Sequence, residues 1–175
     1  SIKPKKVGLY VCGPTVYESD HLGHARTYLS FDLLNRFLRN SGLKVIYIQN
    51  ITDVGHLVGD GEIGVDKLAK KARSSEQTIA QVADYFTKAH FKDLRSLNII
   101  MPDQFPKASE HIKEIVSFIE GLITAGYAYT TKAGNVYFSV GKKANYGQLS
   151  RRGLAEILTG TRIQPASDKR SAVDF

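Results

Sequence analysis

The sequence predicts an α/β fold that starts with the first half of a doubly wound parallel sheet and continues into a smaller α+β part. Two apolar runs rich in β-branched residues, at 6–12 and 44–49, flank an amphipathic stretch at 22–40. A strand, a helix and a strand joined by short connections form a right-handed βαβ unit. After residue 101 the pattern changes to a helix, a hairpin and a short helix, which is typical of an α+β unit.

The first strand is expected at residues 6–12, because this near-continuous apolar run is of the kind that parallel sheets bury on both faces. The Gly13-Pro14 pair ends the strand. A helix follows at 22–40, with Asp20 placed to cap its start and Gly42 to close it. The apolar residues that recur at helical spacing, and that we expect to face inward, are Ala25, Leu29, Leu33, Phe37 and Leu38.

The second strand is expected at residues 44–49, where the sequence KVIYIQ alternates with β-branched residues. In a parallel sheet the carboxyl ends of neighbouring strands meet at one edge. The loops after Val11 and after Gln49 are therefore expected at the same edge, which is where open α/β sheets bind nucleotides.

A Gly- and Asp-rich loop is expected at residues 51–64, followed by a helix that ends near Leu97. Ser74 and Gln77 have the spacing of a capping box for the start of this helix. The residues expected on its inner face are Ile79, Val82, Phe86, His90 and Leu97.

Beyond residue 101 we expect a helix at 109–125, two strands at 127–131 and 135–140, and a short helix at 154–158. Gly126 closes the first of these helices, and the prolines at 102 and 106 mark a boundary before it. The residues expected to face inward are Ile112, Ile115, Ile119, Leu122 and Ile123. The predicted division is a first unit over residues 1–101 and a second over residues 102–175.

Composition limits the class of protein without naming it. The chain has 175 residues, of which 42% are hydrophobic, and a net charge of +7 that is spread evenly along the sequence. No apolar run approaches the roughly 20 residues that cross a bilayer, and no signal peptide is visible. A single cysteine excludes an internal disulfide and fits a cytoplasmic location without membrane association. The mild basic excess is compatible with an RNA partner but decides nothing.

The residues that carry chemistry lie in the stretch LYVCGPTVYESDHLGHA at Leu9–Ala25. His21 and His24 are three apart, so both project from the same side of the first helical turn. Two imidazoles there can donate hydrogen bonds to phosphate oxygens, and the helix N-terminus favours the same group. Gly23 lacks a Cβ, which lets a base or ribose lie on the backbone. The pattern favours attack on the α-phosphate of ATP, although two histidines at a helix start are a weak signal alone.

Three other residues have ordinary structural interpretations when they are considered in isolation. Cys12 is then a small buried hydrophobic residue, since free cysteines are among the most buried residue types. Thr52 is a strand-end hydroxyl that pairs with the local backbone. For Tyr17, packing of the loop and a place in the pocket are equally favoured.

With these motifs in view, the chain resembles the N-terminal portion of the cysteine–tRNA ligases, which are class I aminoacyl-tRNA synthetases. The resemblance begins with CGPTVY at Cys12–Tyr17 and with HLGH at His21–His24, which matches the class I HIGH motif with leucine for isoleucine. It covers essentially the whole chain but about the first third of a complete ligase. The further matching segments are NITDVGH (Asn50–His56), PDQFPKASEHI (Pro102–Ile112), GYAY (Gly126–Tyr129), YGQLS (Tyr146–Ser150) and DKRSAVDF (Asp168–Phe175).

The resemblance implies a Rossmann-like catalytic domain whose first half is followed by an insertion (connective) domain, truncated here at its end. It also implies an enzyme that activates cysteine with ATP to cysteinyl-adenylate and transfers the cysteinyl group to tRNA(Cys). This segment alone is expected to be inactive. Half of a doubly wound sheet leaves a free strand edge and an uncovered apolar face, so self-association of the fragment is expected.

The resemblance also implies roles for individual residues. His21 and His24 are the expected catalytic residues, and Cys12 is the expected zinc ligand, one of four in the family. The other three ligands would lie beyond residue 175, so zinc is expected to be weak or absent in this chain. His56 departs from the family pattern and has no assigned role. The residues expected to line the pocket for ATP and cysteine are Gly13, Pro14, Thr15, Tyr17, Gly23 and Thr52.

Two alternatives stay open on the sequence. One is a cysteine ligase of the mycothiol-biosynthesis type, which has a related fold. The other is a stand-alone, non-catalytic nucleotide-binding module, because the chain has no clear KMSKS loop and residues 168–171 are a poor match to one.

Overall fold

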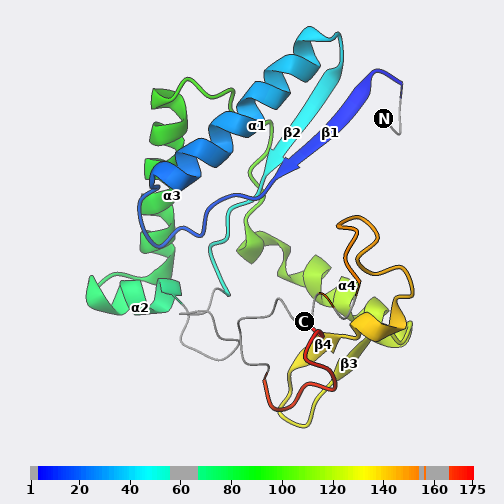
Figure 1. The fold of residues 1–175 in the computed structure, drawn as a ribbon. Helices are drawn as coiled ribbons and strands as arrows, with labels where there is room; N and C mark the ends of the chain where they lie inside the picture. Colours follow the sequence, from blue (N-terminus) through cyan, green and yellow to red (C-terminus); the bar gives the residue numbers. More distant parts are fainter. Residues whose placement is uncertain (1–3, 56–66, 154–155, 157–165) are drawn as a thin grey trace. The chain divides into compact units, whose positions relative to one another are not determined.

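The computed structural model describes residues 4–55, 67–153, 156 and 166–175, and Figure 1 shows their course. The chain forms two compact units, which are described separately. The described part of the first unit comprises residues 4–55 and 67–111, and that of the second comprises residues 112–153, 156 and 166–175. The interpretation of the second unit as an inserted domain stays a prediction.

The first unit is an α/β arrangement built on two parallel strands, as the sequence predicts. Strand pairing runs in register from Lys6 opposite Lys44 to Val11 opposite Gln49. The bounds of the first helix and the second strand agree with the prediction, and the first strand ends one residue earlier than expected. The elements are β1 (Lys6–Val11), α1 (Leu22–Asn40), β2 (Lys44–Gln49), α2 (Lys67–Ser74), α3 (Ile79–Ser96) and the 3-10 turn η1 (Ala108–His111).

A third extended segment, residues 103–107, lies parallel to β2 on the side away from β1. The Gln49 N–H donates to the Gln104 carbonyl at 3.1 Å, and the Ile51 N–H donates to the Pro106 carbonyl at 2.9 Å. In the part of the chain that the structure describes, β2 is therefore central and β1 is an edge strand.

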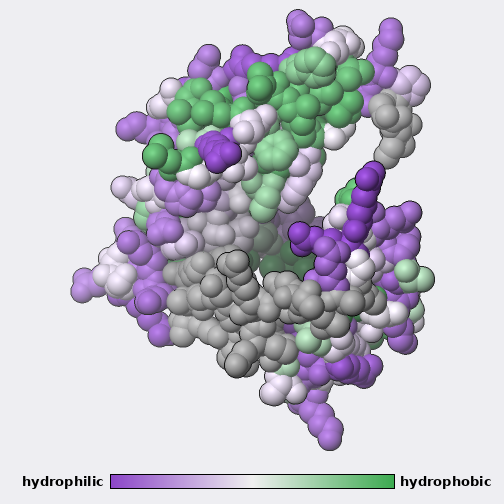
Figure 2. Space-filling view, viewed as in Figure 1, coloured by the Kyte–Doolittle hydropathy of each residue, from purple (hydrophilic) through white to green (hydrophobic). Residues whose placement is uncertain are grey.

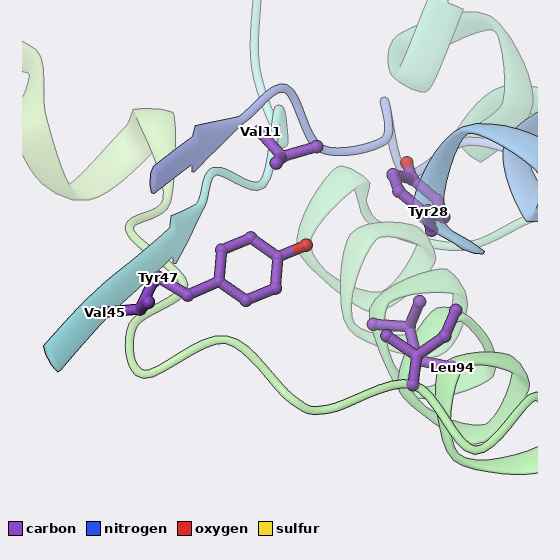
Figure 3. Close-up of a cluster of buried hydrophobic side chains, with 6 residues drawn as sticks. Val11, Tyr28, Val45, Tyr47 and Leu94 are labelled. Atoms are coloured by element: carbon purple, nitrogen blue, oxygen red, sulfur yellow. The ribbon is translucent and has the colours of Figure 1, made fainter. Parts of the chain in front are cut away.

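One hydrophobic cluster joins β1, α1, β2 and α3. Figure 3 shows Val11 at the end of β1 and Tyr28 of α1 with Val45, Tyr47 and Leu94. Each of these five side chains is at most 4% exposed. The cluster fixes the carboxyl end of β1 against the start of α1, which is where the predicted site lies.

The expected burial of β1 on both faces is wrong. Lys6, Gly8 and Tyr10 are exposed, and the exposed fraction of Tyr10 is 62%. The side chains alternate because the described residues cover only one face of the sheet.

The predicted inner face of α1 is wrong for three of its five residues, whereas Ala25 is half-buried and Leu38 is half-buried and packs against the cluster. Leu29, Leu33 and Phe37 are 42%, 71% and 65% exposed, and hydrophobic side chains gather on the surface over α1 in Figure 2. The helix instead buries Tyr28 together with the polar side chains of Asp32 and Asn35.

Hydrogen bonds allow α1 to bury these polar groups. Asp32 accepts from the Arg36 Nε at 2.6 Å and from the Ile100 N–H at 2.9 Å. Asn35 accepts from the Arg39 Nε at 2.8 Å. A buried carboxylate is tolerated only when it is paired in this way, and the Ile100 N–H gives Asp32 a partner outside α1.

Two helix starts differ from the prediction. The N-cap of α1 is His21 and not Asp20, and the capping box of α3 is formed by Thr78 and Gln81. Ser74 was expected to cap a helix, but it ends α2, a helix that the sequence did not predict. The Ser74 hydroxyl donates to the Lys71 carbonyl at 2.8 Å, so it satisfies the last turn of α2 instead of the first turn of α3.

The described residues of the second unit contain the first predicted helix and the predicted antiparallel hairpin, with strands shorter than predicted. Tyr129 lies opposite Tyr137 in the hairpin. The helix begins at Ile112, after the separate turn η1, and none of its side chains is fully buried. Of the residues predicted to face inward, Ile119 and Leu122 are half-buried, and the prediction is wrong for the exposed Ile112, Ile115 and Ile123. The predicted helix at 154–158 falls almost entirely outside these residues. The elements are α4 (Ile112–Thr124), β3 (Ala128–Thr130), β4 (Val136–Phe138) and the 3-10 turn η2 (Val140–Lys142).

The last described segment is tied to this hairpin by carboxylates. Asp168 accepts hydrogen bonds from the Thr131 hydroxyl at 2.7 Å, the Asn135 amide at 3.0 Å and the Tyr137 hydroxyl at 3.0 Å. These bonds, that of Thr131 first, lower the pKa of Asp168 below its usual value. The segment matching DKRSAVDF is thus part of the second unit.

No helix in the ranges 4–55, 67–153 and 166–175 combines the length and apolar character that a membrane span requires.

The buried carboxylate of α1 predicts a contrast between two ion pairs of equal length. Asp32→Ala removes a buried acceptor of two hydrogen bonds, and we expect a loss of about 2 to 4 kcal/mol in the free energy of unfolding. Asp84→Ala removes an exposed pair with Lys88, also at 2.6 Å, and we expect about 0.5 kcal/mol or less. Urea unfolding measures both, and equal losses would contradict the assignment of Asp32.

Burial of Tyr47 predicts a loss of stability at alkaline pH. Burial, with a smaller contribution from the carboxylate of Asp32, raises the pKa of Tyr47 from 10.0 to about 12. Between these values the folded state holds a proton that the unfolded state releases. The free energy of unfolding therefore falls as the pH rises from 10 towards 12, by up to about 1.4 kcal/mol per pH unit. Urea unfolding across this range should show a shallower loss in Tyr47→Phe, and an unchanged slope would contradict the prediction.

Candidate nucleotide-binding site

The loops that follow β1 and β2 meet, as the parallel sheet predicts. The Val16 N–H donates to the Thr52 carbonyl at 3.2 Å, and the Thr52 N–H donates to the Pro14 carbonyl at 3.1 Å. Thr15 and Thr52 form a parallel bridge. These backbone bonds bring four of the predicted pocket residues, Gly13, Pro14, Thr15 and Thr52, to one edge of the sheet.

Gly13 is required where the two loops cross. A Cβ at this position would lie 1.7 Å from the carbonyl oxygen of Asn50, which no side chain can accommodate. The Gly13 N–H donates to the Asn50 Oδ1 at 2.9 Å. The sequence suggested that Gly13 approaches a ligand, and the structure gives this glycine a packing reason of its own. Its contact with a ligand stays a prediction.

Asn50 is a site residue that the sequence reasoning missed. Its Oδ1 also accepts from the Tyr10 hydroxyl at 2.9 Å, and its Nδ2 donates to the Thr52 Oγ1 at 3.1 Å. Because this bond uses a lone pair of the Thr52 hydroxyl, the hydroxyl proton can be donated to a ligand. The available signal was a polar amide directly after a buried strand.

Asp53 has a structural contact that the sequence did not indicate. Its carboxylate accepts from the Ser109 N–H at 2.9 Å and from the Ser109 hydroxyl at 2.5 Å. Asp53 is 9% exposed, and it anchors the start of η1 to the loop after β2.

Cys12 is exposed, so its interpretation as a buried hydrophobic residue is wrong. Its thiol lies at the carboxyl end of β1, 3.7 Å from the Gly13 carbonyl oxygen. The described residues contain no group of three or more His, Cys, Asp or Glu side chains placed to hold a metal ion. Cys12 therefore supplies one accessible soft ligand at the loop crossing.

Tyr17 is half-buried and packs against the second hydrophobic cluster of the first unit, which contains Val16 and Ile51. A hydrogen bond with Glu18, followed by burial, raises the pKa of Tyr17. These contacts favour loop packing, and a place for Tyr17 in the pocket stays a prediction.

His21 caps α1 with its imidazole. The ring Nδ1 accepts from the Gly23 N–H at 3.0 Å and from the His24 N–H at 3.4 Å. A neutral ring that accepts at Nδ1 carries its proton on Nε2, which makes Nε2 a donor. Gly23 permits this, since a Cβ there would lie 2.8 Å from the His21 Cε1.

The two histidines of HLGH lie on the same side of the first turn, as their spacing predicts. Their rings are stacked, with centroids 4.0 Å apart and planes 13° apart. His21 is exposed and His24 is half-buried. The His24 Nδ1 lies 3.3 Å from the His21 backbone nitrogen and 3.2 Å from the Asp20 Oδ1. His56 lies outside the described residues.

A cavity of about 520 Å³ opens beside the histidines, between the start of α1 and the end of α3. Its apolar wall includes Ala25, Tyr28 and Leu94. Its polar lining residues are Asp20, His21, Asp93 and Ser96. Its size is that of small-molecule sites.

A parallel βαβ unit with paired histidines at the start of its first helix is the architecture of a class I tRNA synthetase catalytic domain. Two solved structures share this fold. The Mycobacterium tuberculosis methionyl-tRNA synthetase matches 70% of this chain and 23% of its own, with a TM-score of 0.56 and 22% identity. A Campylobacter jejuni protein described as an arginyl-tRNA synthetase matches 82% of this chain and 40% of its own, with a TM-score of 0.57 and 18% identity.

The chain belongs to the family described as tRNA synthetases class I (C) catalytic domain, which matches residues 1–175. Its curated relatives include the cysteine–tRNA ligase of Chlorobium chlorochromatii, which is 48% identical over 97% of this chain and 35% of the relative. The cysteine–tRNA ligase of Thermus thermophilus is 42% identical over 98% of this chain and 36% of the relative. The chain matches the N-terminal part of these ligases and spans about a third of their length.

The loop crossing predicts opposite results for two glycines that are five residues apart. Gly13→Ala forces its Cβ onto the Asn50 carbonyl, and we expect a loss of at least about 3 kcal/mol in the free energy of unfolding, or failure to fold. Gly8→Ala, in β1, places a Cβ with nothing within 4 Å, and we expect a change within about 1 kcal/mol. Urea unfolding compares them, and a tolerated Gly13→Ala would contradict the described crossing.

Proposed function

We propose that this chain supplies part of the ATP-binding site of a cysteine–tRNA ligase. The complete enzyme would join cysteine and ATP into cysteinyl-adenylate with release of pyrophosphate, and would then transfer the cysteinyl group to tRNA(Cys). The observation that carries the proposal is the stacked pair His21 and His24 at the start of α1, beside the crossing of the loops that follow β1 and β2.

The histidines have the chemistry that adenylate formation needs. The carboxylate of cysteine attacks the α-phosphorus of ATP in line, and negative charge develops on the phosphate oxygens. His21 presents an Nε2–H donor because its Nδ1 caps the helix. Donors held in place before the reaction stabilise that charge without reorganisation, and the N-terminus of α1 acts in the same sense.

The residues at the loop crossing offer groups that could contact both the amino acid and the nucleotide. Thr52 keeps a hydroxyl proton for a ligand acceptor, because Asn50 donates to its oxygen. Gly13, Pro14 and Thr15 present backbone at the same edge, and Gly23 leaves the first turn of α1 open. Tyr17 would support the loop through its packing.

Cys12 suits zinc as a single soft ligand, since its thiol is exposed at the loop crossing. When bound, zinc would hold the substrate thiolate and so distinguish cysteine from serine. The described residues do not assemble a complete zinc site, and weak or absent zinc binding by this chain stays a prediction. Binding of tRNA, a cytoplasmic location, self-association and inactivity of the segment alone also stay predictions. The relatives support the tRNA enzyme over a mycothiol-type ligase or a stand-alone module.

Calorimetric titration with a non-hydrolysable cysteinyl-adenylate analogue tests the proposal on the full-length protein and on this chain. We expect His24→Ala to weaken binding by about tenfold or more, the cost of losing one charge-assisted hydrogen bond. The matched control is His111→Ala, because His111 is exposed and its ring pairs with the Lys107 carbonyl in its own turn. Equal affinity of His24→Ala and the unchanged protein would overturn the proposal.

A further inference from the structure

A buried histidine outside the HLGH motif connects to it through a carboxylate. His90 of α3 is 2% exposed. Its Nδ1 lies 2.5 Å from the Asp20 Oδ2, and its Nε2 lies 3.2 Å from the Gln49 Oε1. The helical spacing predicted only that His90 faces inward.

Asp20 places one oxygen on each of two histidines. Its Oδ2 faces His90, and its Oδ1 lies 3.2 Å from the Nδ1 of His24. The Asp20 side chain is 11% exposed, so both contacts are largely shielded from solvent. The ring of Tyr28 stacks on His24, with centroids 6.2 Å apart, and contacts His90 by its edge at 5.2 Å. The four side chains form one connected group.

This carboxylate does not serve the helix end. The N-cap of α1 is the His21 ring, which satisfies the backbone donors that an aspartate at position 20 was expected to satisfy. Both Asp20 oxygens are directed to imidazoles instead. The Asp20 carboxylate therefore contacts the imidazole of His24 in the motif and not the backbone of the first helical turn.

We propose that His90 is a positioning residue that, through Asp20, fixes the ring of His24 for its contact with phosphate. The inference rests on the proposed function of HLGH. His24 Nδ1 lies near two groups, the Asp20 carboxylate and the His21 N–H. Since these two groups lie at Nδ1, Nε2 is the His24 ring nitrogen left to contact a phosphate oxygen.

His90 is what holds Asp20 in that position. Its Nδ1–H occupies the second carboxylate oxygen, and Gln49 at the end of β2 holds the opposite ring nitrogen. The Gln49 amide offers an acceptor and a donor, and its Nε2 has no partner in the part of the chain that the structure describes. Gln49 can thus pair with His90 in either protonation state of the ring. The chain of contacts runs from β2 through α3 to the start of α1.

Cysteine-dependent ATP–pyrophosphate exchange by the full-length protein tests this inference. His90→Leu removes both hydrogen bonds, and we expect kcat to fall about tenfold or more because His24 loses its orientation, with KM for cysteine unchanged. His90→Asn keeps an N–H at the place of Nδ1 and should restore most of kcat. Thr87→Val, at another buried position one turn earlier on α3, is the control that leaves the network intact.

The decisive comparison is the double variant of His24→Ala and His90→Leu. A residue that acts through His24 adds no further loss once His24 is absent, so the double variant should match His24→Ala. The inference would be overturned if the fold losses in kcat of the two single variants multiply in the double variant. It would also be overturned if His90→Leu lowers kcat no more than Thr87→Val does.

Failure of the proposed function gives a different pattern. If His24→Ala alone leaves exchange unchanged, HLGH has no role in the reaction, and both proposals are overturned. Asp20→Asn, which keeps the side-chain volume, enters the same double-variant comparison with His24→Ala if His90→Leu does not fold. If Asp20→Asn lowers kcat in the unchanged protein but not in the His24→Ala variant, the inference is supported. If its effect on kcat multiplies with that of His24→Ala, the inference is overturned.

Discussion

The close approach of Gly13 to the Asn50 carbonyl is the constraint on which the candidate site depends. Parallel pairing of β1 and β2 delivers both loops to one edge, and only a residue without a Cβ lets them cross there. The crossing then places the Cys12 thiol and the Thr52 hydroxyl at that edge, and it sets where the chain enters α1. The candidate site is thus positioned by backbone geometry.

Local periodicity accounts for what the sequence predicted well. The bounds of α1 and β2 follow from the sequence pattern, and the meeting of the loops follows from the parallel direction of the two strands. The contact of His90 with Asp20 joins residues 70 positions apart, and nothing local signals it. The cap of α1 was missed because a rule for helix starts favours aspartate, whereas here Asp20 is engaged by two imidazoles.

The reversed face of α1 has a different cause. Apolar periodicity predicts which side of a helix avoids water, but it does not say which neighbour covers that side. In the described residues the Asp32 carboxylate of α1 accepts from the Ile100 N–H, and Arg39 donates to the Val45 carbonyl of β2, while Leu33 and Phe37 face outward. Specific polar partners outweigh periodicity here because an unpaired buried carboxylate costs more than an exposed leucine. An apolar surface of this kind is consistent with the expected self-association, which stays a prediction.

Three histidines of one unit show how neighbours, rather than residue type, assign a role. The Nδ1 of His21 accepts a hydrogen bond from the Gly23 N–H at the start of α1, which leaves Nε2 as the donor. His24 stacks on it, beside a carboxylate. His90 is buried and meets the other oxygen of the same carboxylate. Because His24 and His90 share Asp20, the proposed orientation of the His24 ring depends on α3. The HLGH sequence alone gives no sign of this helix. If HLGH binds phosphate as proposed, a substitution on α3 is therefore expected to alter phosphate recognition without contacting the nucleotide.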